Sequence, residues 1–380
     1  MLQSRIDMVF SLRSFHAAMY QNLHRRFDML KISHVCAIAL LTCLPGIVAA
    51  AADPLAWPQT LPVYDHIVIV VEENKDFEEI FGGKFNAPYL KQLAAEGASI
   101  SHMFGEEHPS EGNYFWLFSG SNQNVGFSDA VPSAANHLAD YPFRGSNLGE
   151  QLIKKGLSFK GYAESLPAIG SEVDVDPPGC SGDSCVYGRK HVPWISFANI
   201  PNGATIDTSC NLRFADFPTD YAKLPTVAFV IPNLNDDIHN GKPAESIPAG
   251  DAWLAQNLDR YYKWAKTHNS LLIVTFDEND DKDQYHGLTN PSVRPRSAYP
   301  PVDEYDQHLL DLRNRIVTIF AGAHIKPGAY AEGKGIMHVN ILRTIEAMYG
   351  LPKSGAQQPN ALGAGIGDEA IVTDIFEPLK

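Results

Sequence analysis

The stretch DHIVIVVEEN, residues Asp65–Asn74, decides the fold. Its apolar residues Ile67–Val71 follow one another without a polar interruption, and the run stops abruptly at acidic residues. An unbroken β-branched run favours a strand that is buried on both faces, as the strands of a parallel sheet are. The same signature recurs in three later segments, Thr226–Asp237, Ser270–Asp281 and Asn314–Ile325. A further strand is expected at Leu157–Ser165.

Segments with helical spacing alternate with these strands. Glycine marks several of their ends, and Gly350 with Pro352 closes the last one. The alternation predicts an α/β fold with a mainly parallel central sheet that is flanked by helices on both faces. Asp251, near the start of one helix, is expected to be its N-cap. The expected helices are Ala87–Ala98, Ser146–Gly156, Gly250–Thr267 and His338–Gly350.

The N-terminal part of the chain carries a targeting signal. Residues Cys36–Ala52 carry no charge, follow Lys31 and end in small residues. This pattern is typical of a signal peptide, and its apolar run is shorter than the about 20 residues of a membrane span. We therefore expect residues 1–52 to be an extension with a signal peptide and residues 53–380 to be one catalytic domain. The mature protein would be secreted or periplasmic and without a stable membrane span, and an uncleaved anchor helix is the alternative.

Charge and cysteine content exclude some functions. The net charge of −14 argues against sequence-independent nucleic-acid binding, which needs a basic surface. Cys180 and Cys185 flank the short segment SGDS and are expected to form a local disulfide, which leaves Cys210 unpaired. No CxxC pair supports a thiolate zinc site. The long segments Glu164–Pro193 and Asp280–Leu310 are expected to be functional insertions.

Three of the apolar strands end in acidic or amide residues, at Glu72–Asn74, Asn233–Asp237 and Asp277–Asp280. The carboxyl ends of parallel strands meet at one edge of a sheet, where ligands bind. Carboxylates gathered there repel one another unless a cation lies between them, so the pattern predicts a divalent metal site of unknown identity. The alternative is that these acids are helix N-caps or solvated loop residues. The histidines near strand ends, which together with carboxylates suit zinc, manganese or iron, are His108, His239, His286 and His338.

Ser110 lies in HPSEGNYFWLFSG, between a proline and an aromatic run. As a plain N-cap, its hydroxyl would accept a hydrogen bond from a backbone N–H. As a nucleophile, it would attack a phosphate held by the positive end of the helix, and a metal ion would lower the pKa of the hydroxyl. Asn113 is placed to donate to a phosphoryl oxygen. No GxSxG surrounds Ser110 and no P-loop or GxGxxG occurs, while Tyr114–Phe118 is expected to be a buried helix face.

The polar strand ends and Ser110 belong to six longer segments. They are EEN (Glu72–Asn74), EHPSEGNYFWLFSG (Glu107–Gly120), GYAESLP (Gly161–Pro167), PNLNDDIHNG (Pro232–Gly241), TFDENDD (Thr275–Asp281) and HVNILRTIEAMYGLP (His338–Pro352). Together they resemble the phosphoesterase family, which includes bacterial and fungal acid phosphatases and phosphatidylcholine-type phospholipases C within the alkaline phosphatase superfamily. The HPSxxNY motif and the NILRTIEAMYGL ending are most similar to the acid phosphatase branch. The resemblance implies an alkaline-phosphatase-like fold and a metal-dependent phosphoester hydrolase.

The resemblance also implies a metal site and a nucleophile. Glu73 matches a metal-binding glutamate that follows the first strand of the family. Asp277 and Glu278 match an acidic pair that follows a late strand. Ser110 matches the serine that attacks phosphorus, and contact with the metal would lower the pKa of its hydroxyl. The expected ligands of the divalent cation are thus Glu73, Ser110, Asp277 and Glu278.

Other matched residues would bind phosphate or move protons. Asn113 matches a phosphate-binding asparagine, and Asn74 would lie near the phosphate. His108 or His191 would protonate the leaving group. Val192 stands where the family usually has asparagine, directly after His191. The further residues expected to bind phosphate or substrate are Lys190, Asp237, His239 and His338.

These roles predict a two-step displacement, in which Ser110 forms a phosphoserine that water then hydrolyses. The favoured function is an exported, metal-dependent acid phosphatase that cleaves phosphomonoesters of a small molecule or a lipid. A phospholipase C or another phosphodiesterase of the same family is the alternative. An exported protein that binds metal or phosphate without turnover is the third possibility.

Overall fold

The structure is a computed structural model. It describes residues 61–125, 129–133, 140–280, 314–330, 336–355 and 371–378. Every described residue belongs to one compact unit, Pro54–Lys380. The predicted signal peptide, His286 and nearly all of the predicted insertion Asp280–Leu310 therefore lie outside the described residues.

A mainly parallel sheet of nine strands forms the core of the described residues. Its central strand β1 (His66–Glu72) pairs in parallel with β7 (Val227–Ile231) on one side and with β8 (Ser270–Phe276) on the other. Every residue of β7 and β8 is buried, as their apolar runs predicted. The strand order is β10-β2-β9-β8-β1-β7-β3-β6, with β11 beside β2. The remaining strands are β2 (Ala98–Phe104), β3 (Phe159–Ala163), β6 (Asn211–Arg213), β9 (Arg315–Gly322), β10 (Gly328–Tyr330) and β11 (Ile336–Met337).

β9 is the exception to the parallel arrangement. It runs antiparallel to both of its neighbours, β8 and β2. The apolar run of β9 predicted a buried strand and not its direction, because a strand covered on both faces needs the same residues in either direction. The carboxyl ends of β1, β7 and β8 still point to one common edge.

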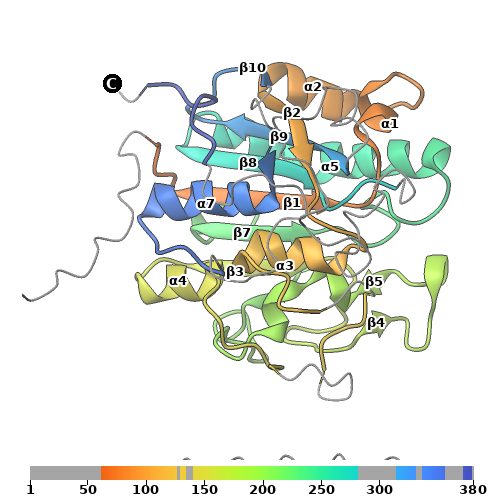
Figure 1. The fold of residues 1–380 in the computed structure, drawn as a ribbon, viewed down its shortest axis with the longest axis vertical. Helices are drawn as coiled ribbons and strands as arrows, with labels where there is room; N and C mark the ends of the chain where they lie inside the picture. The colour runs from red at the N-terminus through yellow and green to blue at the C-terminus, as the bar shows by residue number, and fades with distance from the viewer. Residues whose placement is uncertain are drawn as a thin grey trace, which may run out of the picture. The chain divides into compact units, whose positions relative to one another are not determined.

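Helices cover both faces of the sheet. In Figure 1, α3 (Glu111–Ser119) and α7 (His338–Tyr349) lie in front of the strands and α5 (Pro243–Ala265) runs behind them. Every residue of α3 is buried, which confirms the expectation for Tyr114–Phe118. The shorter helices are α1 (Phe77–Phe81), α2 (Pro88–Glu96) and α4 (Leu148–Lys154).

Asp251 is not an N-cap of its own helix, so that prediction is wrong. α5 begins at Pro243, and Asp251 lies inside it. The carboxylate of Asp251 instead accepts hydrogen bonds from the backbone N–H of Tyr89 at 3.0 Å and of Leu90 at 2.8 Å, in the first turn of α2. A buried carboxylate needs donors, and the free N–H groups at the start of a neighbouring helix provide them.

A disulfide closes a short hairpin. The strands β4 (Val175–Asp176) and β5 (Tyr187–Gly188) pair antiparallel, and Cys180 and Cys185 between them are joined. The thiol of Cys210 is free and buried. The predicted pairing of the cysteines is confirmed.

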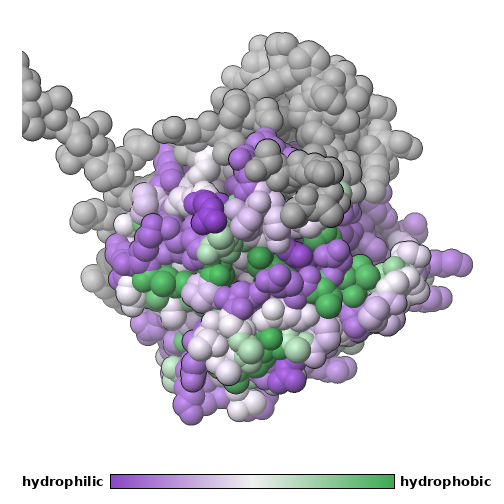
Figure 2. Space-filling model, turned by 90° about the horizontal axis from the view of Figure 1, so that it is seen from below, coloured by the Kyte–Doolittle hydropathy of each residue, from purple (hydrophilic) through white to green (hydrophobic). Residues whose placement is uncertain are grey.

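Apolar side chains on the surface are scattered. Figure 2 shows one face of the molecule, on which hydrophobic residues form small, separate groups among hydrophilic ones. Large exposed hydrophobic side chains in the described ranges belong to Val63, Ile153, Val173 and Ile206, from different parts of the chain. Over the same ranges, no helix combines the length and the apolar character that crossing a membrane requires.

Candidate active site

The carboxyl ends of β1, β7 and β8 bring the three polar segments to one edge of the sheet. The backbone N–H of Glu73 donates to the carbonyl of Asp237 at 2.7 Å, and that of Asp277 donates to the carbonyl of Glu72 at 3.0 Å. The chain therefore leaves each strand beside the other two. The side chains of Glu73, Asp237, Asp277 and Glu278 are all buried at this edge.

Ser110 occupies the N-cap position of α3, but its side chain does not cap the helix. The hydroxyl instead donates toward Glu73 Oε2, at 3.2 Å, and Glu278 Oε1, at 3.1 Å. On the other side of Glu278, His108 Nδ1 contacts Oε2. The alternative that Ser110 is a plain N-cap is therefore wrong, and its hydroxyl joins acids from two different strand ends.

Tyr114 and His191 complete the surroundings of Glu73. The Tyr114 hydroxyl donates to Glu73 Oε1 at 2.5 Å, and His191 Nε2 lies 3.1 Å from the same oxygen. The ring of His191 stacks on that of Tyr114 with centroids 4.9 Å apart, and its Nδ1 is 3.9 Å from Asp237 Oδ2. Burial lowers the pKa of His191 well below its usual value, so this imidazole is neutral near pH 7.

His239 and His338, which were also predicted to belong to the site, differ in their surroundings. His239 is half-buried, and its ring centroid lies 6.1 Å from that of His191. His338 is held by the scaffold, with Nδ1 2.6 Å from Glu106 Oε2 and Nε2 2.7 Å from the carbonyl oxygen of Phe276. Both ring nitrogens of His338 are thus engaged within the fold.

The two asparagines expected near the phosphate also make contacts within the fold. Asn113 Oδ1 accepts from the backbone N–H of Glu106 at 2.9 Å and of Glu107 at 3.1 Å, and its Nδ2 donates to the carbonyl of Glu107 at 2.7 Å. At most one amide hydrogen of Asn113 is therefore available to a phosphate oxygen. The backbone N–H of Asn74 donates to Asp277 Oδ1 at 3.0 Å, which places Asn74 beside the acidic edge.

Asp129 joins the site although no pattern in the sequence predicted it. Its Oδ2 accepts from Lys190 Nζ at 2.7 Å, and its Oδ1 accepts at 2.9 Å from the backbone N–H of Glu111, the first residue of α3. Tyr114, expected only as part of the core, is the second such residue. It follows Ser110 by one helical turn, a spacing that signals a shared helix face. Asp129 follows no strand and offers no such signal.

Four buried carboxylates make this edge strongly acidic. Burial is the largest cause that raises the pKa values of Glu73, Asp237 and Asp277, and repulsion between the acids adds to it. Asp277 Oδ2 is buried, and no hydrogen bond to it forms within the described part of the chain. A divalent cation would offset these charges and satisfy that oxygen. Glu73, Ser110, Asp277 and Glu278 therefore fit a metal site.

A second acidic group consists of Asp76, Glu79 and Asp280. Each of these residues offers an oxygen, and the three oxygens lie within 4.8 Å of one another, which no other group of described residues matches. Asp76 and Glu79 are half-buried and Asp280 is exposed. Water can stabilise half-buried and exposed acids without an ion. The buried set of Glu73, Asp277 and Glu278 does not meet this spacing among the described residues, and the metal site predicted there stays a prediction.

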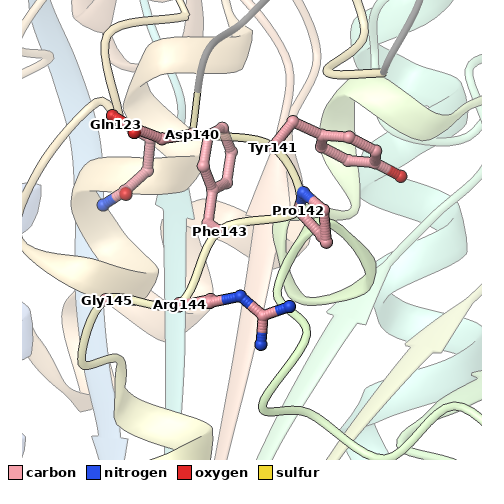
Figure 3. A pocket seen from close by; sticks show the side chains of 7 residues that line it. All are labelled: Gln123, Asp140, Tyr141, Pro142, Phe143, Arg144 and Gly145. Carbon is pink, nitrogen blue, oxygen red and sulfur yellow. The ribbon is translucent and has the colours of Figure 1, made fainter.

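A separate cavity of about 490 Å³ is lined by Gln123 and Asp140–Gly145. Figure 3 shows these side chains, with the ring of Tyr141 among them. Arg189, directly before Lys190, donates from its guanidinium to the Tyr141 hydroxyl at 3.0 Å. None of the predicted site residues lines this cavity, so it is distinct from the acidic edge.

Known proteins share sequence with this chain. Residues 83–352 match the profile of the phosphoesterase family. Over 340 residues, the chain is 40% identical to a phosphatidylinositol-3-phosphatase of Mycobacterium tuberculosis, covering 89% of this chain and 93% of that protein. It is 29% identical to a probable acid phosphatase of Kluyveromyces lactis, covering 57% of this chain and 48% of the yeast protein. A solved structure of a Vibrio parahaemolyticus protein in the alkaline phosphatase superfamily superposes with a TM-score of 0.49 and 13% identity, covering 78% of this chain and 71% of that one.

Proposed function

This chain belongs to the phosphoesterase family and is a phosphoric ester hydrolase, and we propose that it is a metal-dependent acid phosphatase that cleaves phosphomonoesters through a phosphoserine on Ser110. One observation carries the proposal: the Ser110 hydroxyl lies at the N-terminus of α3 and faces Glu73 and Glu278 instead of capping the helix. A hydroxyl beside bases and at the positive end of a helix suits attack on a phosphate. Both relatives described above carry phosphatase names, which favours a monoester substrate.

Glu73, Asp277, Glu278 and the Ser110 hydroxyl would hold the divalent cation. When bound, the cation supplies positive charge that lowers the pKa of the hydroxyl and offsets charge on the phosphoryl oxygens. The ammonium of Lys190 and the remaining amide hydrogen of Asn113 bind phosphoryl oxygens on the protein side.

Side chains of the protein accept and donate the protons of the reaction. Ser110 Oγ forms a bond to phosphorus while the bond from phosphorus to the leaving oxygen breaks in line with it. The hydroxyl proton passes to a carboxylate that it already faces, Glu73 or Glu278. His108 protonates the leaving oxygen, since the lowered pKa of His191 leaves that imidazole neutral, without the extra proton that a general acid donates. Water then attacks phosphorus and gives a proton to His108, while the bond from phosphorus to Ser110 Oγ breaks. The carboxylate returns its proton to Oγ as phosphate leaves.

The substrate class follows from the match to the Mycobacterium tuberculosis protein. Because the chain covers 93% of a phosphatidylinositol-3-phosphatase at 40% identity, a phosphoinositide is the phosphomonoester that we favour. Action outside the cytoplasm is part of the proposal. The disulfide between Cys180 and Cys185 supports it, because such bonds persist in oxidising compartments.

A substrate panel tests this function. We would compare p-nitrophenyl phosphate, its bis-ester, phosphatidylinositol 3-phosphate and phosphatidylcholine between pH 4 and 9, with and without a chelator. The proposal expects release from the two monoesters with a maximum below pH 7, and loss of that release in the chelator. Turnover of the diesters alone would instead assign a phosphodiesterase or a phospholipase C.

A further inference from the structure

The carboxylate of Asp129 connects two elements that carry reactive groups. One of its oxygens accepts from Lys190 Nζ at 2.7 Å, and the other accepts from the backbone N–H of Glu111 at 2.9 Å. Lys190 belongs to the short turn that follows β5, and Glu111 comes directly after Ser110. Asp129 therefore ties the lysine to the helix that presents the serine.

Asp129 and Lys190 are more exposed to solvent than Ser110 and Glu278. Their side chains are 22% and 21% exposed, whereas Ser110 and Glu278 are each 1% exposed. Solvent therefore reaches the pair of Asp129 and Lys190 more readily than it reaches the serine.

Several carboxylates attract Lys190. Glu73, Asp129 and Asp277 all attract its ammonium, and Glu73 and Asp277 are among the acids that would hold the cation. The lysine stem is flexible, so the position of the ammonium depends on which carboxylate holds it. The hydrogen bond at 2.7 Å shows that Asp129 is the partner that holds it.

We propose that Asp129 is a positioning residue that holds the Lys190 ammonium beside the Ser110 site, away from Glu73 and Asp277. This inference rests on the proposed function, because it explains how Lys190 stays available to a phosphoryl group. Without the Asp129 carboxylate, the ammonium moves toward Glu73 and Asp277 and competes with the cation for them.

Competition between the Lys190 ammonium and the cation can be detected from two binding constants, that of the cation and that of phosphate. Asp129→Asn keeps an oxygen for the Glu111 N–H but removes the charge that holds the lysine. We expect it to weaken binding of the cation and of phosphate together. Adding Lys190→Met removes the competing ammonium, so cation binding recovers while phosphate binding does not. Simple damage to the fold would not be repaired by a second substitution.

The experiment is calorimetry on the purified chain with Mn²⁺ as the metal probe, followed by inorganic phosphate at saturating Mn²⁺. The four proteins of the cycle are the native chain, D129N, K190M and the double variant. We expect D129N to weaken Mn²⁺ binding by about fivefold or more and phosphate binding by about tenfold or more, and the double variant to bind Mn²⁺ as K190M does. Asp259→Asn is the matched control, because Asp259 pairs with Lys263 at 2.6 Å on the surface of α5 and should change neither constant.

Tighter phosphate binding by D129N would overturn the inference, because Asp129 would then be a competitor of the substrate. Unchanged Mn²⁺ binding by D129N, a double variant that stays weak, or a native chain that binds no Mn²⁺ would overturn it as well. If D129N does not fold, Asp129→Glu, which keeps the charge on a longer stem, should show the same two shifts at smaller size. Both binding constants are measured without turnover. If the four proteins show the expected shifts but the native chain hydrolyses no phosphoester, the proposed function is wrong and this inference stands.

Discussion

The orientation of the Ser110 hydroxyl is set by the sheet and not by its own helix. Glu73 follows β1 and Glu278 follows β8, and the hydroxyl lies between their carboxylates. These strands are neighbours, so the register of the sheet brings the two acids to one place. The nucleophile that we propose is thus a property of tertiary structure that α3 alone would not produce.

Tyr114→Phe tests the contacts around Glu73. The Tyr114 hydroxyl lowers the pKa of Glu73 by donating to it, so its loss should raise that pKa. A hydrogen bond to a charged group contributes about 1.5–3 kcal/mol, so we expect kcat/KM to fall about 10- to 100-fold. The acidic limb of the pH profile should move to higher pH, which steady-state kinetics from pH 4 to 9 would measure.

Tyr261→Phe is the control for that substitution. It removes a buried hydroxyl that donates to the carbonyl of Leu271 at 3.0 Å, away from the acidic edge. It should lower stability without moving the pH profile. An unchanged acidic limb in Tyr114→Phe would contradict the part that we give to Tyr114.

At the scale of elements, each helix is secured by groups from other elements. Phe118 on α3 packs with ring centroids 5.3 Å from Phe159 on β3 and 5.8 Å from Phe229 on β7. Asp251 on α5 binds the first turn of α2. Packing therefore decides where the helices lie, and the site inherits its geometry from that packing.

Asp251→Ala tests the cap that α5 provides to α2. Loss of a capping carboxylate costs about 1–2 kcal/mol of unfolding free energy, and the loss leaves two backbone N–H groups without their partner. We expect urea unfolding to show that loss, with kcat and KM of the folded enzyme unchanged. Asp259→Ala, on the exposed side of the same helix, should change stability by less than about 0.5 kcal/mol. A raised KM in Asp251→Ala at native stability would instead give Asp251 a role at the substrate.

The elements that were predicted well are those whose signal is local. Uninterrupted apolar runs identified β1, β7 and β8, and glycine ends identified α4 and α7. β2 was not predicted, because His102 and two serines interrupt its apolar residues. The prediction that Asp251 is an N-cap was wrong because α5 begins earlier, at Pro243. Proline suits the first turn of a helix, but from sequence alone it also indicates a helix break.

At the scale of the whole molecule, topology explains why the acids of the site were predictable. Acids that follow parallel strands meet at one edge of the sheet, independently of the conformation of the loops. Glu73, Asp237 and Asp277 could therefore be predicted from sequence. Asp129 was not, because its partner Lys190 is 61 residues away and neither residue follows an apolar run. The assignment of a metal and the roles of Asn113 and His338 stay predictions.

The buried acids also make stability depend on pH. Burial raises the pKa of Glu107 to about 8 and that of Glu111 to about 9, and it raises the pKa values of Asp237 and Asp277 as well. In the unfolded chain these groups ionise near pH 4. Between about pH 4 and pH 9 the folded state therefore binds more protons than the unfolded state. The contribution of these groups to the free energy of unfolding is complete below about pH 4 and is lost as pH rises toward 9. His191 acts in the opposite direction, but only below about pH 6.5.

Thermal unfolding of the metal-free protein between pH 7 and 9 tests this dependence. We expect the melting temperature to fall by about 5 °C or more over that range. Saturation with a cation should reduce the fall, because the cation stabilises the ionised acids. Asp277→Asn should reduce it in the metal-free protein and abolish most of the effect of the cation. A melting temperature that rises with pH in the chelated protein would contradict the electrostatics of the site.

The measurement that tests the central claim most directly is the activity of Ser110→Ala together with its metal content. If Ser110 is the nucleophile, turnover of p-nitrophenyl phosphate should fall by at least about a thousandfold even at saturating metal, while the melting temperature stays near its native value. Loss of the hydroxyl as a ligand should weaken metal binding, but Glu73, Asp277 and Glu278 should still hold the ion. The native enzyme, quenched in acid during turnover, should then carry one phosphoryl group on the peptide that contains Ser110. Native-like turnover by Ser110→Ala, or a quenched enzyme without phosphate on that peptide, would contradict the account.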